Sequence, residues 1–400
     1  MKRKNILTTL MTIIITALVT FTVTALWQYG KIENKEASGE EVIGKALSED
    51  ALTSKLKQIR QKIDNSFVGE VNDDTLKEYA VKGFVAGLDD DYSQYFTKEE
   101  MKKYTEDTLG SYVGIGIYMS KDKEKNTIKV HRVIEDSPAQ KSGVKDNDVI
   151  KKVEDKEITA DDFDNIANMI EGKAGTKVKI VFDRDGEEIT KDITREKIVI
   201  KSVQSKMIDN NIGYIYISTF DGDVSKEFKE SYDKLLNEGM KSLVIDMRNN
   251  GGGVAKEAVE IGDYFSEKGK NLLIEEDKNK KEEITKADRD KEITMKTAVL
   301  VNENSASASE ILAAILKENA DNATVVGKKT FGKGVIQTLY RLSDGSGLKI
   351  TTNKYYTPNH NNIDKEGVIP DIETEKYDFN GELKKDEDIQ LNKAIDTLNN

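Results

Sequence analysis

The first hydrophobic stretch of the chain has the length and flanking residues of a membrane span. No charged residue occurs between Asn5 and Gly30, and the apolar centre, Ile6 to Trp27, is about 22 residues long, enough to cross a bilayer at ~1.5 Å per residue. The basic end, Met1 to Lys4, favours the cytoplasmic side. The pattern predicts a transmembrane signal anchor over residues 1–30, with the remainder of the chain outside the cytoplasm. A cleaved signal peptide, and hence a secreted protein, is the alternative.

The next segment, residues 31–103, combines a polar spacer with helical periodicity. The composition is polar from Lys31 to about Lys45, and helical patterns follow from Ala46 to Leu88. Apolar residues recur there at the 3.6-residue period of an amphipathic helix. They are Leu52, Leu56, Ile59 and Ile63. Residues 31–103 are therefore predicted to form a spacer and a helical arm, which ends in a turn at Asp89 to Asp91.

Strand patterns alternate with helical patterns between residues 194 and 380. Ile212 to Ile217 alternates as a strand, Val224 to Leu236 has a helical pattern, and Leu243 to Arg248 is typical of a buried parallel strand. A short amphipathic helix is expected within residues 381–400. The fold class predicted for the whole chain is α/β and multidomain.

Composition narrows the range of partners. The 400 residues suffice for two or three domains. A net charge of -12 argues against nucleic acid as a partner. The absence of cysteine excludes thiol catalysis, disulfides and thiolate metal sites. We expect no cofactor and no catalytic metal.

The candidate chemistry lies between Asn302 and Gln337. A run of small residues leads into an amphipathic segment, Ile311 to Leu316, which places Ser307 at a helix start. Lys333 stands between two glycines and precedes a strand-like alternation. Lys333 and Gln337 are four residues apart, so on a strand both would point to one face. The hypothesis is a serine nucleophile whose proton is taken by a lysine.

A lysine can act as a base at neutral pH only if its pKa is lowered from about 10.4 to near 7. Desolvation shifts the pKa of a fully buried lysine by roughly 3 to 5 units, which is sufficient. The two histidines, His131 and His360, have no catalytic motif around them.

Simpler structural interpretations of these residues exist. Ser307 followed by Glu310 is a capping box. Lys333 taken alone would be a solvated turn residue. Gly327 to Lys333 nearly forms a phosphate-binding loop, but Gly334 follows where Ser or Thr is required, and a strand pattern replaces the helix. We reject nucleotide binding, and the joint pattern of the serine run, Lys333 and Gln337 favours catalysis.

At these positions the chain resembles the carboxyl-terminal processing peptidases, also called tail-specific proteases. The resemblance rests on Ser305 to Glu310, on Thr330 to Gly334 and on Gln337. It implies that Ser307 is the nucleophile, that Lys333 is the general base, and that Gln337 orients the lysine.

The resemblance also implies an oxyanion hole made by the amides of Gly252 and Ala308. The segment Asn249 to Gly253 lies between a predicted strand and a predicted helix, a natural place for amides that stabilise an anion. It is similar to the family's Asp-x-Arg-x-Asn-x-Gly-Gly stretch. The family commonly has proline at the position of Gly251.

Residues 104–193 resemble a PDZ domain. A loop of alternating glycine and apolar residues can present successive amides to the terminal carboxylate of a peptide. The loop residues are Gly114, Ile115, Gly116 and Ile117. Ser137 to Ala139 and Gly143 to Ile150 follow in the expected order, and Phe163 to Ile170 is expected to form the helix beside the peptide groove.

Together these features predict an anchor, a helical arm and a PDZ domain inserted before an α/β serine-lysine peptidase core. The expected function is a membrane-anchored serine endopeptidase. Its expected partners are the membrane and extracytoplasmic proteins or peptides with a free carboxyl-terminal tail. The segment Leu88 to Ser93 is similar to the family's arm and implies a homodimer. The alternative is an anchored PDZ peptide-binding module with a silent hydrolase core.

Overall fold

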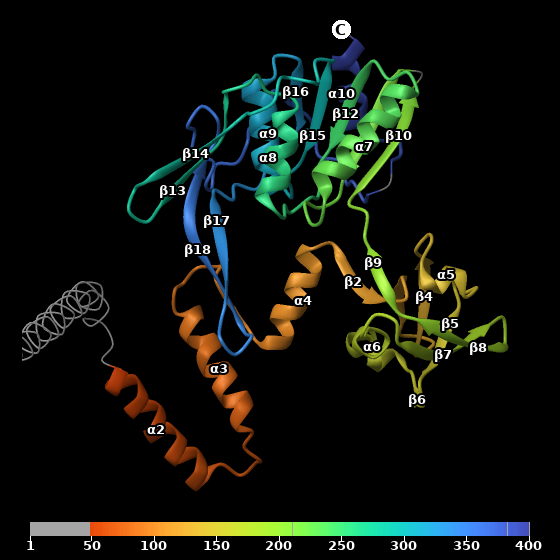
Figure 1. The fold of residues 1–400 in the computed structure, drawn as a ribbon, viewed down its shortest axis with the longest axis vertical. Helices are drawn as coiled ribbons and strands as arrows, with labels where there is room; N and C mark the ends of the chain where they lie inside the picture. Colours follow the sequence, from red (N-terminus) through yellow and green to blue (C-terminus); the bar gives the residue numbers. More distant parts are fainter. Residues whose placement is uncertain (1–48, 210, 382, 400) are drawn as a thin grey trace, which may run out of the picture. The chain divides into compact units, whose positions relative to one another are not determined.

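The computed structural model describes residues 49–209, 211–381 and 383–399 (Figure 1). The predicted anchor over residues 1–30 and the polar spacer from Lys31 to about Lys45 lie outside these ranges. Among the helices of the described residues, none combines the length and the apolar character needed to cross a membrane. The chain divides into two compact units, residues 1–79 and 80–400, which are taken in turn.

Two helices carry the pattern predicted for the arm, α2 (Glu49–Ser66) and α3 (Asp73–Ala86). The predicted apolar stripe lies along α2 and remains accessible, because Leu52, Leu56 and Ile59 keep 37%, 45% and 48% of their surface exposed. The helical prediction for this segment is confirmed.

An antiparallel sheet follows between residues 117 and 194. Its strand order is β3-β4-β5-β7-β8, with β6 paired to β5. The elements are β3 (Ile117–Asp122), β4 (Thr127–Val133), α5 (Pro138–Lys141), β5 (Val149–Val153), β6 (Lys156–Glu157), the 3-10 turn η1 (Ala160–Asp162), α6 (Phe163–Ile170), β7 (Lys177–Arg184) and β8 (Glu187–Thr194). Ile166 of α6 packs with Val130 and Ile180 in a common apolar core. Outside this sheet, β2 (Ser111–Gly114) pairs with β9 (Glu196–Val199), so the chain enters and leaves this region side by side.

A six-stranded sheet forms the centre of the carboxyl-terminal region (Figure 1). The strand order is β10-β11-β12-β15-β16-β19, and all neighbours are parallel except β10 and β11. The strands are β10 (Val203–Asp209), β11 (Ile212–Ile217), β12 (Ser242–Asp246), β15 (Thr297–Val301), β16 (Ala323–Gly327) and β19 (Ile372–Glu373). The helices are α7 (Val224–Asn237), α8 (Ala255–Asp263), α9 (Ala308–Asn319) and α10 (Ile389–Asn399).

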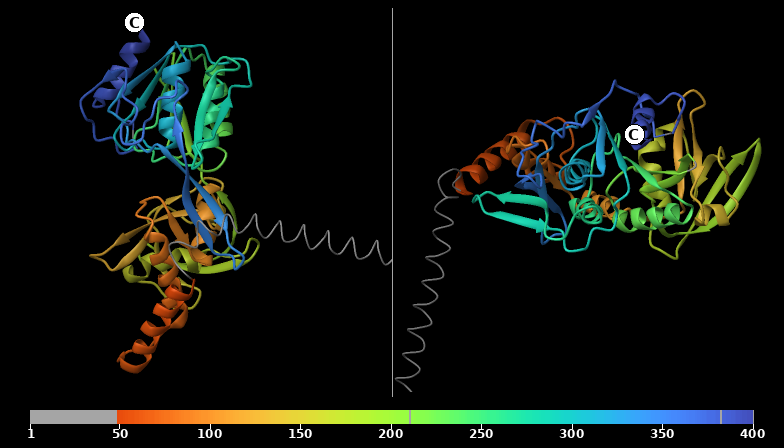
Figure 2. Two further views of the ribbon diagram at one scale, coloured as in Figure 1. Left: turned by 90° about the vertical axis from the view of Figure 1, so that its left-hand side faces the viewer. Right: turned by 90° about the horizontal axis from the view of Figure 1, so that it is seen from above.

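Helices cover both faces of this sheet (Figure 2). On one face, Phe228 of α7 and Leu312 of α9 belong to the same apolar cluster as Ile245. On the other face, Leu391 of α10 packs with Val244. Burial on both faces explains why the parallel strands are nearly continuous apolar runs in the sequence.

A second, antiparallel sheet has the strand order β1-β18-β13-β14, and β17 also pairs with β18. The strands are β1 (Gln94–Phe96), β13 (Asn271–Asp277), β14 (Glu282–Lys286), β17 (Val335–Arg341) and β18 (Gly347–Tyr356). Strand β1 lies between the arm and α4 (Lys98–Thr108) in the sequence. The end of the predicted arm is therefore an edge strand of the same sheet that contains β17.

A buried ion network lies at the carboxyl end of β12. Arg248 donates to Asp246 at 2.6 Å and to Asp388 at 2.8 Å, and all three side chains are completely buried. Burial alone would lower the pKa of Arg248, but the two carboxylates outweigh it and raise that pKa. Asp388 also accepts the amide of Leu391 at 2.9 Å. The network thereby ties the start of α10 to the central sheet.

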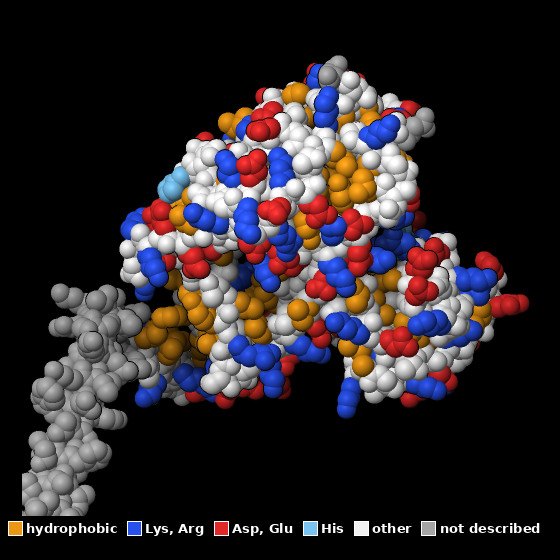
Figure 3. Space-filling model, turned by 45° about the horizontal axis from the view of Figure 1, so that its top comes forward, with side chains coloured by type: hydrophobic (Ala, Val, Ile, Leu, Met, Phe, Trp, Pro, Cys, Tyr) orange, Lys and Arg blue, Asp and Glu red, His pale blue; other side chains and the backbone are white. Residues whose placement is uncertain are grey.

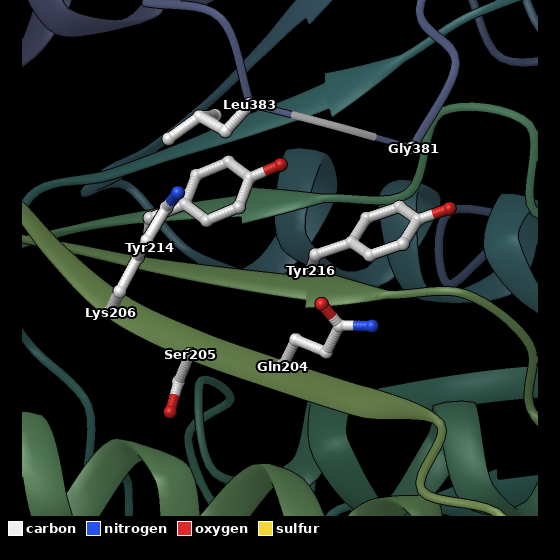
Figure 4. Close-up of a pocket in the computed structure, with 7 residues that line it drawn as sticks. All are labelled: Gln204, Ser205, Lys206, Tyr214, Tyr216, Gly381 and Leu383. Atoms are coloured by element: carbon white, nitrogen blue, oxygen red, sulfur yellow. The ribbon is translucent and has the colours of Figure 1, made fainter. Parts of the chain in front are cut away.

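A small cavity of about 120 Å³ lies beside β10 and β11 (Figure 4). Its lining residues are Gln204, Ser205, Lys206, Tyr214, Tyr216, Gly381 and Leu383. The hydroxyl of Tyr214, one of its polar lining groups, already donates to Asp246 of the ion network at 2.8 Å. We assign the cavity to packing.

Acidic and basic side chains are interspersed over the surface that Figure 3 shows. Exposed pairs of opposite charge occur within single helices, as between Lys226 and Glu230 at 4.0 Å. On this face the charges are therefore mixed, although the whole chain has a net charge of -12.

Candidate active site

Ser307 lies immediately before α9, at the helix start that the sequence predicts. Its backbone has φ 56° and ψ -113°, a conformation that costs a non-glycine residue about 1 to 3 kcal/mol. Two neighbouring serines hold this turn, since Ser305 donates to the carbonyl of Met247 at 2.8 Å and Ser309 to that of Asn250 at 2.9 Å. The strain at Ser307 is thus maintained by the packed loops around it.

The completely buried carboxylate of Glu310 connects the two candidate catalytic segments. One of its oxygens accepts the amide of Ser307 at 2.8 Å and that of Lys333 at 2.9 Å. The other accepts the amide of Gly332 and the hydroxyl of Thr330, both at 2.6 Å. Ser307 and Glu310 have the predicted capping-box arrangement. A cap alone, however, needs no bond to residues 330–333.

Lys333 lies two residues before β17. The prediction that Lys333 and Gln337 share a face of one strand is therefore wrong, because it assumed that Lys333 belongs to the strand. The side chain of Lys333 is half-buried, and its ammonium nitrogen is 4.5 Å from the centre of the Tyr92 ring. Burial lowers the pKa of Lys333, and the charge of Lys349 lowers it further. Asp90 and Glu310 act in the opposite direction without reversing the shift. The direction is the one that a lysine base requires.

Gln337 lies on β17, and its amide nitrogen donates to the hydroxyl of Thr351 at 3.1 Å. Among the described residues, no hydrogen bond joins the Lys333 amine to Ser307 or to Gln337. Catalytic hydrogen bonds are commonly long in the absence of substrate. Glu310 therefore holds the backbones of Ser307 and Lys333 close together. Their side chains are not hydrogen-bonded to each other in this structure.

The loop after β12 places Gly252 against Ser307. A Cβ atom at Gly252 would lie 2.8 Å from the Cβ of Ser307 and 3.1 Å from the amide nitrogen of Ala308, and φ is 104°. A side chain at this position would be excluded by both the space and the backbone conformation. At Gly251 a Cβ would meet no atom within 4 Å.

The two predicted oxyanion donors differ in their present partners. The amide of Gly252 donates to the side-chain oxygen of Asn250 at 2.9 Å. Ala308 is the first residue of α9, where backbone amides have no partner within the helix and the helix dipole favours negative charge. The Ala308 amide therefore has the character of an anion site, whereas the Gly252 amide is occupied by an internal acceptor.

The predicted peptide-binding loop, residues 114–117, borders a groove of about 200 Å³. The groove lies between β3 and α6 and is lined by Tyr112, Ile115, Ile117, Tyr118, Met119, Ala167, Ile170 and Glu171. The ring of Tyr112 lies so close to Gly114 that a Cβ there would be 2.7 Å away. Burial raises the pKa of Tyr112 to about 12, even though backbone hydrogen bonds from Gly116 and Ile117 act to lower it. The Tyr112 hydroxyl thus lies near the backbone of the loop predicted to bind a carboxylate.

Several residues of the site did not emerge from the sequence. Glu310 was interpreted only as a cap, and Tyr92 only as part of the arm. Tyr355, whose hydroxyl donates to the Ser307 carbonyl at 3.3 Å, and Lys349 had no local pattern to mark them. Within the described part of the chain, no three His, Asp or Glu side chains gather as a metal site would require.

Comparison with known families divides the chain into three matches. Residues 211–374 match the model of peptidase family S41, and residues 112–194 match that of the PDZ domain. Residues 13–100 match the "Activating protease CtpB N-terminal domain". The candidate nucleophile and base both fall within the peptidase match.

Individual relatives agree with these matches. The chain is 36% identical over 335 residues to the "Carboxy-terminal processing protease CtpA" of Bacillus subtilis (strain 168), covering 84% of this chain and 71% of the relative. It is 38% identical over 342 residues to the "Probable CtpA-like serine protease" of Staphylococcus aureus (strain MRSA252), covering 84% and 68%. The crystal structure of a putative S41 protease from Bacteroides fragilis NCTC 9343 has the same fold, with a TM-score of 0.50 at 15% identity over 80% of this chain and 90% of that one.

Replacing Glu310 tests whether its carboxylate holds the two segments together. Glu310→Gln puts an NH₂ group where an oxygen now accepts backbone amides, so we expect unfolding free energy to fall by about 1 to 3 kcal/mol. We also expect peptide hydrolysis to fall by more than the unfolded fraction explains. Denaturant titration and initial rates measure the two effects. Glu238→Gln, at an exposed position at the end of α7, is the control. Wild-type rates in a folded Glu310→Gln protein would contradict the assignment.

Proposed function

Because the chain belongs to the carboxy-terminal processing proteases of peptidase family S41, we propose that it is a membrane-anchored endopeptidase with Ser307 as nucleophile and Lys333 as general base. The observation that carries this assignment is the pair of bonds from Ser307 and Lys333 to one oxygen of Glu310. These bonds keep the two residues adjacent although 26 positions separate them in the sequence.

The reaction is an acyl transfer. The neutral amine of Lys333 accepts the hydroxyl proton of Ser307 as the serine oxygen attacks the peptide carbonyl. The amine then returns this proton to the leaving nitrogen, and water hydrolyses the ester in a second round of the same transfers. Gln337, which now bonds Thr351, would orient the lysine once substrate aligns the side chains.

Negative charge develops on the carbonyl oxygen during both steps. The amide of Ala308 supplies one donor at the start of α9. The amide of Gly252 supplies the second when it leaves the Asn250 oxygen, to which it is now bonded. The close approach of Gly252 to the Cβ of Ser307 and to the Ala308 amide supports this role.

We assign substrate recognition to the groove beside residues 114–117. Its apolar lining suits the side chains of an extended tail added along β3, and the loop amides suit the terminal carboxylate. The carboxylate would displace the Tyr112 hydroxyl, which now lies near the backbone of Gly116 and Ile117.

The apolar run of residues 1–30 supports anchoring, with the catalytic part and its substrates outside the cytoplasm. The accessible apolar stripe of α2 supports a homodimer formed through the arm.

Ser307→Ala tests the enzyme proposal. We expect peptide hydrolysis to fall at least about 10³-fold, because the nucleophile is gone. Loss of the cap costs only about 1 kcal/mol, so the fold should survive. Ser343→Ala, exposed in the turn between β17 and β18, should retain the wild-type rate. Equal hydrolysis by wild type and Ser307→Ala would leave the PDZ module with a silent core as the better description.

Blocking the substrate's terminal carboxyl tests the groove. We expect an amidated peptide to bind roughly tenfold or more weakly than the same peptide with a free carboxylate, since charge-assisted bonds to the loop amides are lost. Tyr112→Phe should tighten binding of the free-carboxylate peptide only. Fluorescence anisotropy measures both. Equal affinity for the two peptides would refute carboxylate capture.

Fractionation tests the anchor. The full chain should sediment with membranes and dissolve only in detergent, whereas a chain that starts at residue 31 should stay in the supernatant. Protease added outside intact cells should degrade the anchored form. A soluble protein that has lost its amino-terminal segment would favour secretion after cleavage instead.

A further inference from the structure

The segment that ends the arm is bound to the strand opposite the base. Strand β1 pairs with β18, with Gln94 opposite Lys349. Just before β1, the hydroxyl of Ser93 accepts the amide of Thr351 at 3.1 Å. Thr351 is also the residue that receives the hydrogen bond from Gln337. Residues 90–96 therefore contact the same part of β18 as the catalytic strand β17.

Lys349 lies in the middle of this arrangement. It is opposite Leu339 of β17 and Gln94 of β1, and it is two residues from Thr351, hence on the same face of β18. Since Thr351 bonds Gln337, the side chain of Lys349 projects on the side of the sheet where the candidate catalytic residues are found.

Aromatic rings from the arm and α4 lie against both lysines. The Tyr92 ring centre is 4.5 Å from the Lys333 nitrogen. The Lys349 nitrogen is 5.5 Å from the Phe96 ring centre and 5.1 Å from that of Tyr104. Phe96 and Tyr104 are themselves stacked at 4.8 Å. Such rings attract a cation through their faces while excluding water from it.

Within residues 49–209, 211–381 and 383–399, neither Lys333 nor Lys349 forms an ion pair. The charged groups that face Lys333 are Lys349 on β18, Asp90 before β1, and Glu310 on α9. Glu310 is already bonded to four donors and Asp90 to Ser93 and the amide of Tyr92. Lys349 is thus a second positive charge near the base. Its ammonium group is stabilised by the faces of aromatic rings and not by a carboxylate.

We propose that Lys349 and Tyr92 are positioning residues for the reaction: Lys349, held by Phe96 and Tyr104, keeps Lys333 in its neutral form, and the Tyr92 ring fixes the direction of the Lys333 amine. The inference rests on the proposed role of Lys333 as the base. It also gives the end of the arm and α4 a part in catalysis, since all three rings that hold these lysines lie between positions 92 and 104.

The sign of the effect follows from electrostatics. A nearby positive charge disfavours protonation of Lys333, so burial and Lys349 together lower its pKa. Because only the neutral amine accepts the serine proton, kcat/KM falls as the pH drops through that pKa. Removing the charge of Lys349 raises the pKa of Lys333 and moves the acid limb of the profile to higher pH.

The test is the pH dependence of kcat/KM for the full chain in detergent, with an internally quenched peptide as substrate. For Lys349→Met we expect the acid limb to move up by about half a unit to one unit, which is roughly a three- to tenfold loss below the midpoint and none above it. Lys349→Arg should restore the wild-type midpoint. Lys354→Met removes a charge from an exposed position of the same strand and should not move the midpoint.

Tyr92 is tested in the same assay. Tyr92→Phe keeps the ring and should keep kcat within about twofold, whereas Tyr92→Leu should lower kcat about tenfold or more with little change in KM. Equal losses in the two variants would show that the hydroxyl, not the ring, is required, and would overturn this part of the proposal.

An unmoved acid limb in Lys349→Met, or a loss equal at every pH, would overturn the role of Lys349. Lys333→Met separates this result from failure of the proposed function. If Lys333→Met abolishes hydrolysis while Lys349→Met leaves the profile unmoved, only the present inference fails. If Lys333→Met hydrolyses peptides as well as wild type does, the dyad itself is wrong.

Discussion

A carboxylate removed from water must find donors for its oxygens, and Glu310 finds all four in the backbone and side chains of two separate loops. The loops are the start of α9 and the segment Thr330 to Lys333. Losing any one donor would leave a buried oxygen short of a partner, at a cost of about 1 to 3 kcal/mol. The carboxylate therefore acts as a geometric constraint on the nucleophile and the base as well as a cap on the helix. The positive φ of Ser307 is tolerated because this constraint and the bonds of Ser305 and Ser309 over-determine the turn.

The same principle operates on a larger scale at the carboxyl end of the central sheet. Arg248, Asp246 and Asp388 are completely buried, and each ion is compensated by another and by hydrogen bonds. Removal of one member of such a group leaves an uncompensated buried charge. The network lies just before the loop that presents Gly252. It thus fixes the strand end from which one candidate oxyanion donor extends, while Glu310 fixes the other side of the site.

Periodicity in the sequence predicted individual strands and helices, but it did not predict the hydrogen bonds between distant segments. The strand predicted over Ile212 to Ile217 is β11 residue for residue. The helix start at Ser307 was also predictable, because caps and apolar faces are local signals. The partners of Glu310 were not, because Thr330 to Lys333 lies 20 or more residues away and hydrogen bonds to backbone amides leave no trace in side-chain identity. Strand β1 is three residues long and pairs with residues some 250 positions later, beyond the reach of any local pattern.

The prediction that Lys333 and Gln337 point to the same face of one strand failed for a similar reason. It assumed that the strand begins at the lysine, whereas β17 begins at Val335. The positions of Lys333 and its neighbours are set by Gly332 and Gly334, where a Cβ would clash with the backbone of residues 364–367. The glycines were recognised as permitting close approach, but the segment they approach could not be identified from the sequence.

Two of the places assigned to bind substrate already hold an internal oxygen in this structure. The Gly252 amide donates to Asn250, and the Tyr112 hydroxyl lies near the backbone of the loop at residues 114–117. A buried amide without an acceptor would destabilise the substrate-free protein, so these acceptors serve in place of the oxyanion and the carboxylate. At each place a substrate oxygen must therefore replace the internal oxygen as acceptor of the amide. Only a charged substrate oxygen forms a stronger bond than the one it replaces, because charge-assisted hydrogen bonds are stronger than neutral ones. Neutral groups gain little from either site, which favours a free carboxyl terminus in the groove and a developing oxyanion beside Ser307.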